Sequence, residues 1–184
     1  MTTERLQLFT NRLPNLLKLL PKRTAEFAMS SEVAIPTELG SFYLYGCSNT
    51  GKSVMAVKML LHWSKECFIQ RKRTDFLFFK SYDLFIQARK ACHTSPTEEE
   101  LFIKKLKDVS MLVIDDIFVE KTTAWNKEIL YSIMDYRCEY NRPTIITSNY
   151  DLGELSEKFG DDRIPVRIKR LCGENIIQLT NKPY

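Results

Sequence analysis

Residues 46–53 read Gly-Cys-Ser-Asn-Thr-Gly-Lys-Ser and fill every fixed position of the pattern G-x-x-x-x-G-K-[ST]. An apolar run precedes the pattern and a helical pattern follows it, which is the strand–loop–helix setting that the pattern needs. The glycines allow a turn whose backbone N–H groups point inward, and the helix N-terminus adds positive potential. The segment therefore predicts a polyphosphate-binding loop, and its binding residues are Gly46, Ser48, Asn49, Thr50, Gly51, Lys52 and Ser53.

Two residues of this loop carry specific roles. Lys52 is expected to reach the β and γ phosphates of a nucleoside triphosphate, and the Ser53 hydroxyl to bind Mg²⁺. An ordinary glycine turn with a chance lysine is the alternative, and the strand–loop–helix setting disfavours it.

Two adjacent carboxylates end a second apolar run. Residues 111–114 are apolar and lead into Asp115-Asp116. A buried strand with such an end is unusual unless a positive group lies there. Because ligands bind at the carboxyl edge of parallel strands, we expect Asp115 to hold Mg²⁺ and Asp116 to orient or deprotonate an attacking water. Taken alone the pair could be turn or cap aspartates, but together with the phosphate loop it predicts a nucleoside triphosphatase.

Short apolar runs alternate with longer helical patterns from residue 41 onward. This alternation favours right-handed crossovers and a mostly parallel sheet with helices on both faces. Strands are expected at residues 41–46, 75–80, 111–116, 143–149 and 175–179. Helices are expected at residues 53–68, 81–92, 95–107, 124–140 and 151–160.

Polar and basic residues follow the fourth apolar run. Asn149 is expected to position the water or to sense the γ-phosphate, although an ordinary loop asparagine is the alternative. An arginine can stabilise charge on a transferred phosphoryl group and can be supplied in trans. Residues 161–170 gather basic side chains for this role, and a solvated basic face is an equally open interpretation: Arg163, Arg167, Lys169 and Arg170.

The chain of 184 residues has room for one domain with a short appendage. Its net charge of +4 is too mild to require or exclude a nucleic-acid partner. Five cysteines without a C-x-x-C pair disfavour a structural zinc site. No apolar stretch approaches the roughly 18 residues of a membrane span, so we expect a cytoplasmic protein with reduced thiols and no membrane partner.

Residues 1–40 form the appendage, and residues 41–184 form the expected core domain. Apolar residues recur at helical spacing before residue 21 and are interrupted by Pro14, which predicts two short amphipathic helices. A cap packed on the core and a docking helix for a partner are both open.

Taken together, these residues resemble the DnaC/IstB-like branch of the AAA+ ATPases, which are bacterial and phage helicase loaders and transposition helper ATPases. The resemblance runs from about Phe42 to Tyr184 through the stretches MLVIDDI, WNKEILYSIMDYR, RPTIITSNYDLGEL, DDRIPVRIKRL and NIIQLTN. It implies an α/β P-loop NTPase of the AAA+ (ASCE) type, with a five-stranded parallel sheet between helices and no C-terminal helical lid.

The resemblance also implies roles for individual residues. Lys52 and Ser53 belong to Walker A, and Asp115 and Asp116 to Walker B. Asn149 is sensor 1. Arg167 is the arginine finger acting in trans, with Arg163 and Arg170 as alternatives.

By the same resemblance the chain is an ATPase that uses ATP and Mg²⁺ in DNA replication. It would load or remodel a replicative helicase as a homo-oligomer on single-stranded DNA. Basic residues after the second strand, or on the turn before it, would hold the DNA backbone, with solvated helix faces as the alternative for each: Arg71, Lys72, Arg73, Arg89, Lys90, Lys104, Lys105 and Lys107.

Two alternatives of other kinds are open. A transposition helper of the IstB type would use bound ATP as an assembly signal. A small P-loop kinase needs an acceptor pocket and an arginine-bearing lid, and the sequence offers no such lid.

Overall fold

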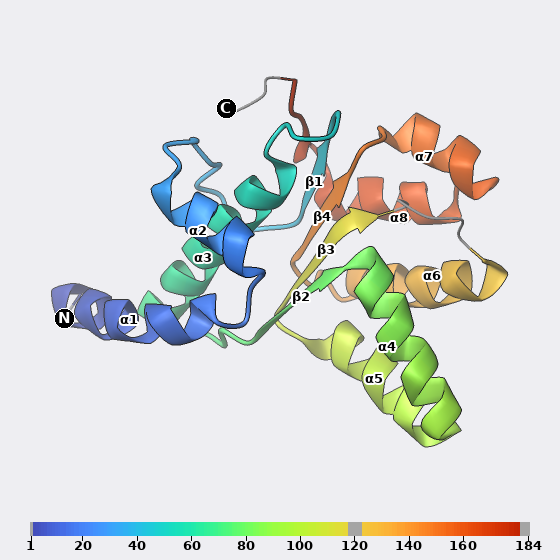
Figure 1. Ribbon diagram of the computed structural model, residues 1–184, viewed down its shortest axis with the longest axis horizontal. Coiled ribbons are helices and arrows are strands. Elements are labelled where there is room, and N and C mark those ends of the chain that lie inside the picture. Colours follow the sequence, from blue (N-terminus) through green and yellow to red (C-terminus); the bar gives the residue numbers. More distant parts are fainter. Residues whose placement is uncertain (1, 118–122, 181–184) are drawn as a thin grey trace.

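The computed structural model of the chain describes residues 2–117 and 123–180. Its centre is one sheet of five strands in the order β2-β3-β4-β1-β5, and every neighbouring pair is parallel. The predicted five-stranded parallel sheet is therefore confirmed (Figure 1). The strands are β1 (Phe42–Tyr45), β2 (Phe76–Lys80), β3 (Met111–Ile117), β4 (Thr144–Ser148) and β5 (Ile176–Gln178).

Helices cover both faces of the sheet (Figure 1). One side carries α1 (Thr2–Leu17), α2 (Lys22–Ser30) and α3 (Lys52–Ile69). The other side carries α4 (Ser81–Thr94), α5 (Pro96–Asp108), α6 (Ala124–Glu139), α7 (Leu152–Phe159) and α8 (Arg163–Cys172).

Alternate side chains of each strand point to opposite faces of the sheet. In β1, Phe42 and Leu44 pack with α3, whereas Tyr43 packs with the core on the α6 and α8 side. Both faces of the central strands are thus buried, which is why these runs are almost continuously apolar.

The order of the strands decides what meets at their carboxyl edge. Strand β4 lies between β1 and β3 and pairs with both. The loop after β1, the two aspartates of β3 and Asn149 after β4 therefore share one edge of the sheet, as the sequence predicts.

The break between the two N-terminal helices lies elsewhere than predicted. Helix α1 runs through Pro14 and ends at Leu17, and α2 begins after Pro21. Pro14 forfeits one N–H donor but is exposed, so a single helix tolerates it at some cost in stability. The chain turns at residues 18–21 because a residue before proline disfavours the helical conformation, and Leu20 is such a residue.

Helix α8 is an addition to the elements that the sequence predicts. Ile164, Ile168 and Cys172 recur at helical spacing and are buried. Pro165 lies in the first turn, where backbone N–H groups have no acceptor within the helix. The segment therefore contains the pattern of a short amphipathic helix, which the sequence analysis interpreted only through its basic residues.

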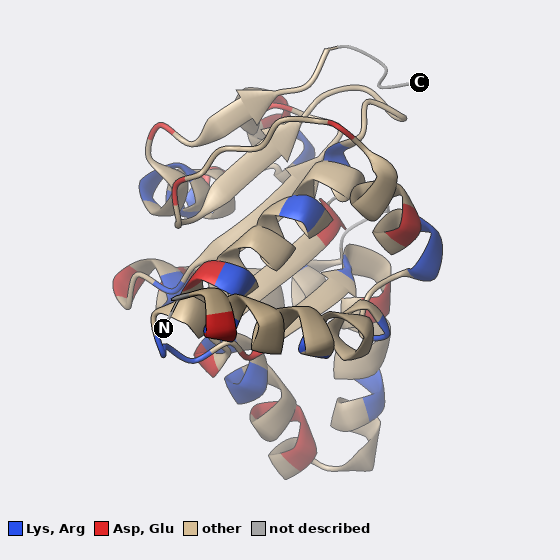
Figure 2. Cartoon of the chain, turned by 90° about the vertical axis from the view of Figure 1, so that its left-hand side faces the viewer, with Lys and Arg blue, Asp and Glu red and all other residues tan. Residues whose placement is uncertain are grey.

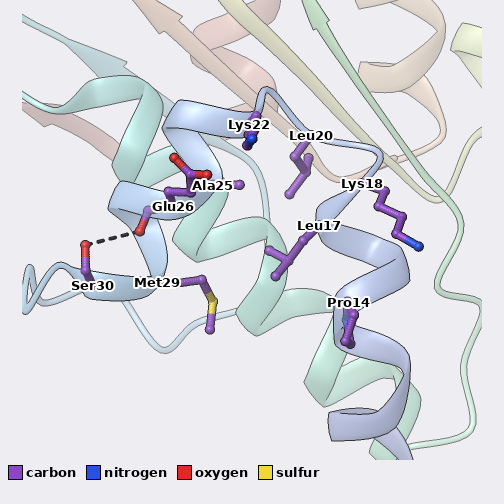
Figure 3. Close-up of a pocket in the computed structure, with 9 residues that line it drawn as sticks. All are labelled: Pro14, Leu17, Lys18, Leu20, Lys22, Ala25, Glu26, Met29 and Ser30. Carbon is purple, nitrogen blue, oxygen red and sulfur yellow. Dashed lines mark hydrogen bonds between the residues drawn. The ribbon is translucent and has the colours of Figure 1, made fainter.

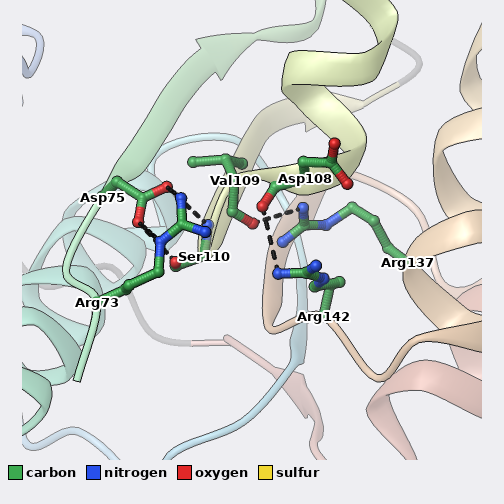
Figure 4. A network of polar contacts seen from close by, with 7 residues as sticks. All are labelled: Arg73, Asp75, Asp108, Val109, Ser110, Arg137 and Arg142. Atoms are coloured by element: carbon green, nitrogen blue, oxygen red, sulfur yellow. Dashed lines mark hydrogen bonds and ion pairs between the residues drawn. The ribbon is translucent and has the colours of Figure 1, made fainter.

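A buried arginine ties the helices to the opposite edge of the sheet (Figure 4). Arg137 of α6 is fully buried and donates to the carbonyl oxygens of Leu106, Val109 and Pro143 at 2.6–3.0 Å. Its Nε donates to the Thr144 hydroxyl at 2.8 Å. Burial lowers the pKa of Arg137 to about 9. This network joins α5, α6 and β4, away from the edge with the predicted site.

Candidate nucleotide-binding site

The loop after β1 has a backbone that requires glycine at its first position. Gly46 has a φ of 142°, and a Cβ there would lie 2.2 Å from the carbonyl oxygen of Leu179. Gly51 has a φ of 87° and precedes the first turn of α3. The Thr50 hydroxyl donates to the Cys47 carbonyl at 2.9 Å across the loop. These contacts set the turn that directs the chain into α3.

Lys52 lies buried beneath this loop. Its Nζ donates to the carbonyl oxygens of Gly46 at 2.9 Å and Cys47 at 2.7 Å. Burial lowers the pKa of the ammonium group, and the nearby carboxylates of Asp116 and Asp115 oppose that change. Lys52 therefore stands between the loop and the carboxylate pair, where it is placed to balance negative charge.

The two aspartates are held by Thr147 of the neighbouring strand β4. The Thr147 hydroxyl donates to Oδ1 of Asp115 at 2.7 Å and accepts from the backbone N–H of Asp116 at 2.8 Å. Asp116 has a φ of 56°, an uncommon value for a residue with a side chain. The threonine hydroxyl thus accepts a hydrogen bond from the backbone at the bent end of β3, and it orients the Asp115 carboxylate.

Asp115 is almost fully buried, and its environment is built for charge compensation. Burial raises the pKa of its carboxyl group, and the Asp116 charge raises it further. Hydrogen bonds from Thr147 and from the Ser53 hydroxyl lower it in part. The contact between Ser53 and Asp115 brings a hydroxyl and a carboxylate together, and such oxygen ligands suit Mg²⁺. The residues present therefore fit a magnesium ion.

Asn149 follows β4 on a turn that Tyr43 supports. The Tyr43 hydroxyl donates to the Tyr150 carbonyl at 2.7 Å, and the Tyr150 backbone N–H donates to the Ser148 hydroxyl at 3.1 Å. Burial raises the pKa of the Tyr43 hydroxyl. A buried tyrosine of β1 thus fixes the turn on which Asn149 stands.

One cavity of about 540 Å³ brings most of the predicted residues together. Three predicted residues are outside its lining. Gly46 and Thr50 shape the loop, and Asp115 is the buried member of the carboxylate pair. Phe27 of α2 and Val54 of α3 are additions that the sequence analysis missed. The lining consists of Phe27, Ser48, Asn49, Gly51, Lys52, Ser53, Val54, Asp116 and Asn149.

The structure does not bring Arg167 into this cavity. Its Nε donates to Oδ1 of Asp135 at 2.6 Å, and its Nη2 donates to the Tyr131 hydroxyl at 2.7 Å. Arg163 lies over the Tyr131 ring at 5.2 Å and pairs with Asp161 at 3.1 Å. Arg167 therefore lies on the α6 and α8 side of the sheet, and Arg170 is exposed on α8.

Phosphate-transferring proteins of the P-loop class cradle phosphates on a strand–loop–helix turn at the carboxyl edge of a parallel sheet. Here the cavity lies at that edge. A lysine, a hydroxyl and an aspartate line it, and a second, buried carboxylate lies beside them. By fold and site the chain belongs to the P-loop class of nucleotide-binding proteins.

Known proteins make this assignment more specific. The family model described as IstB-like ATP binding protein matches residues 36–174. The replicative helicase loader DnaC of Escherichia coli (strain K12) is 28% identical over 123 residues, which are 67% of this chain and 48% of that protein. The chain thus spans about half the length of this relative.

Two solved structures share the fold. A crystal structure of DnaI superposes with a TM-score of 0.60 at 22% identity, over 86% of this chain and 82% of that one. A crystal structure of the DnaC helicase loader gives a TM-score of 0.58 at 23% identity, over 86% and 85%.

The chain belongs to the family of IstB-like ATP-binding proteins, because the family model matches well over half of its length. The predicted class, an ATPase of the DnaC/IstB-like AAA+ type, is thereby confirmed. Within the described ranges, no helix combines the length and the apolar character that crossing a membrane requires.

Proposed function

We propose that the chain hydrolyses ATP with Mg²⁺ and uses this reaction to load or remodel a replicative helicase in DNA replication. It would act in the cytoplasm as a homo-oligomer on single-stranded DNA. The observation that carries the proposal is the single cavity in which Lys52, Ser53, Asp116 and Asn149 meet. The similarity to the replicative helicase loader DnaC supports a helicase as the partner.

Each residue of the cavity has a distinct part in this reaction. Lys52 exchanges its bonds to the loop carbonyls for the β and γ phosphate oxygens. Ser53 and Asp115 would hold Mg²⁺, which when bound neutralises charge on the phosphate oxygens. Asp116 orients or deprotonates the attacking water, and Asn149 holds that water in line with the γ-phosphate.

We assign the arginine that completes the site to a second copy of the chain. Arg167 lies on α8, on the other side of the sheet from α3, so it serves a neighbour rather than its own cavity. Asp135 and Tyr131 hold its guanidinium group, which leaves N–H groups available for a phosphate. Arg163 and Arg170 on the same helix are the alternatives.

The proposed DNA contacts come from helices α4 and α5 and from the turn before β2. Lys90, Lys104 and Lys105 are exposed, whereas Arg89 lies over the Trp125 ring at 5.5 Å. Lys107 lies near the Tyr136 ring at 5.7 Å. Acidic and basic residues are interspersed along the helices (Figure 2), so we expect a few phosphate contacts rather than one continuous basic face.

The remaining candidates lie on the turn between α3 and β2. Arg73 pairs with Asp75 at 3.0 Å, so part of its charge is already compensated. Arg71 and Lys72 are exposed on the same turn. We therefore expect Arg71 and Lys72 to contribute more to DNA binding than Arg73.

Release of phosphate from ATP and Mg²⁺, with and without an oligo-dT strand, tests this function. We expect hydrolysis without any acceptor molecule, stimulation by the strand, and loss of both in Lys52→Ala. Lys65→Ala is the matched control, because Lys65 lies on the same helix outside the cavity lining. A wild-type rate no higher than that of Lys52→Ala would refute the proposed reaction.

A transposition helper is the second candidate, because the matching family model is named for IstB. Such a protein would use bound ATP as an assembly signal. Hydrolysis no faster than that of Asp116→Asn, together with ATP-dependent assembly, would favour it over the helicase loader. The small-kinase alternative finds no support in the family assignment.

A further inference from the structure

A second cavity of about 740 Å³ lies between α1 and α2 (Figure 3). We call it the α1–α2 groove. Leu20 and Ala25 form its buried floor, and Leu17 and Met29 face each other across it. The other lining residues are Pro14, Lys18, Lys22, Glu26 and Ser30.

The groove is apolar inside and basic around it. Met29 of the lining is 53% exposed. Lys18 and Lys22 flank the link between the two helices, against the single acidic residue Glu26. Two lysines against one glutamate give the lining a net positive charge. Arg5 and Arg12 of α1 lie over the Phe68 ring and are outside this lining. An apolar surface with this charge favours an apolar partner that carries acidic side chains.

We propose that the α1–α2 groove binds an amphipathic helix of a partner protein, with acidic residues beside its apolar face, and that nucleotide strengthens this binding. A trough between two helices accommodates a third helix, whose apolar residues at i, i+4 and i+7 fill the space between them. The second part of the proposal rests on the nucleotide binding proposed above.

Helix α2 joins the groove to the nucleotide cavity. Phe27 lines the nucleotide cavity, whereas Ala25, Glu26 and Met29 line the groove. The two cavities therefore share one short helix, and a group bound against Phe27 restrains the same backbone that forms the groove wall. When one ligand has already restrained α2, the second ligand binds with a smaller loss of conformational entropy. The two binding events are therefore positively coupled.

A second connection runs through α3. This helix begins at Lys52 in the phosphate loop, and its Lys58 donates from Nζ to the carbonyl oxygens of Ser31 at 2.7 Å and Val33 at 2.6 Å. Ser31 is the residue that follows α2, and its backbone N–H donates to the Phe27 carbonyl. Lys58 thus ties the end of α2 to the helix that carries the phosphate loop.

The test uses the whole chain and two synthetic amphipathic helical peptides. Both have leucines at i, i+4, i+7 and i+11, and their flanking residues are glutamates in one and lysines in the other. Binding is measured by fluorescence anisotropy with and without AMPPCP and Mg²⁺. We expect the acidic peptide to bind at least about tenfold more tightly than the basic one. AMPPCP should increase the affinity for the acidic peptide about fivefold, and the acidic peptide should increase the affinity for AMPPCP by the same factor.

Three variants locate the effect. Met29→Glu places a charge at an exposed position of the groove, and it should weaken the acidic peptide at least about tenfold while AMPPCP binding alone is unchanged. Lys58→Met should keep both ligands and reduce the coupling factor toward one. Lys65→Met, on the same helix, should keep the coupling intact.

Several results would overturn the proposal. Equal binding of both peptides refutes the charge complementarity, and unchanged peptide binding in Met29→Glu refutes the groove as the site. A change of oligomeric state in Met29→Glu assigns the groove to a second copy of this chain instead. If AMPPCP does not bind, the proposed function and the coupling are both refuted. The docking site would still be supported in that case if the acidic peptide binds the wild type and Met29→Glu abolishes that binding.

Discussion

The Thr147 hydroxyl donates to Oδ1 of Asp115 at 2.7 Å and, with its lone pair, accepts from the backbone N–H of Asp116 at 2.8 Å. One side chain of β4 therefore orients the Asp115 carboxylate and fixes the backbone of Asp116 at the end of β3. Since Ser53 also contacts Asp115, a single buried carboxylate links the phosphate loop, β3 and β4. The geometry of the proposed magnesium site depends on this link.

Thr147→Val should remove the link while keeping the shape of the side chain. Residues that orient a metal ligand typically change metal affinity or activity by 10- to 100-fold, so we expect hydrolysis to fall at least about tenfold and more Mg²⁺ to be needed. Thr147→Ser keeps the hydroxyl and should retain most of the activity. A valine variant within about twofold of the wild type in phosphate release would contradict this role.

Asp115→Asn should stabilise the fold at neutral pH while abolishing hydrolysis. Burial raises the pKa of Asp115 above its usual range, so between the unfolded and folded pKa values the native state binds a proton that the unfolded chain has released. The free energy of unfolding from this group therefore falls as pH rises through that window. Urea unfolding should show the variant more stable than the wild type at pH 7, with a smaller difference near pH 4. The opposite order at pH 7 would show that the charge is better compensated than its burial implies.

Gly46→Ala should be strongly destabilising. The added Cβ would lie 2.2 Å from the Leu179 carbonyl oxygen at a φ of 142°. Strain and overpacking together suggest a cost of more than about 3 kcal/mol in urea unfolding. Gly160→Ala is the control, because it has a φ of 69° and nothing within 4 Å, and it should cost only about 1–2 kcal/mol. Equal losses in the two variants would mean that the contact with Leu179 carries no weight.

Asp135→Asn tests whether the hold on Arg167 matters for the reaction. Asp135 accepts from Arg167 at 2.6 Å, so weakening the pair should lower the maximal rate about tenfold while the KM for ATP stays the same. Asp135→Glu should rescue part of the rate. Asp162→Asn removes a nearby charge whose side chain does not cap α8 and should have no effect. A raised KM for ATP with an unchanged maximal rate would show that Asp135 does not act through Arg167.

The residues that the sequence predicts well are those whose roles depend on local spacing. Lys52 and Ser53 sit in a contiguous loop, and Asp115 ends a run of four apolar residues, so strand, loop and helix follow from neighbours in the chain. The parallel sheet follows from the alternation of strands and helices.

The residues that the sequence analysis missed depend on distant contacts. Thr147 acquires its role from the pairing of β4 with β3, 32 residues earlier in the sequence. Phe27 reaches the cavity because α2 packs against α3, and an exposed phenylalanine on a short helix carries no such signal by itself. The break between α1 and α2 lies at residues 18–21 and ends at Pro21, whereas Pro14 lies inside α1, so which proline ends the helix depends on how the two helices pack on α3.

The division of the site between two copies is most directly tested by mixing Lys52→Ala with Arg167→Ala and measuring phosphate release. Each variant alone should be inactive, and Arg167→Ala should still bind ATP. In a random one-to-one mixture about a quarter of the interfaces combine an intact phosphate loop with an intact arginine, so about a quarter of the wild-type rate should return. A mixture no more active than its separate components would contradict the assignment of Arg167 to the neighbour's site.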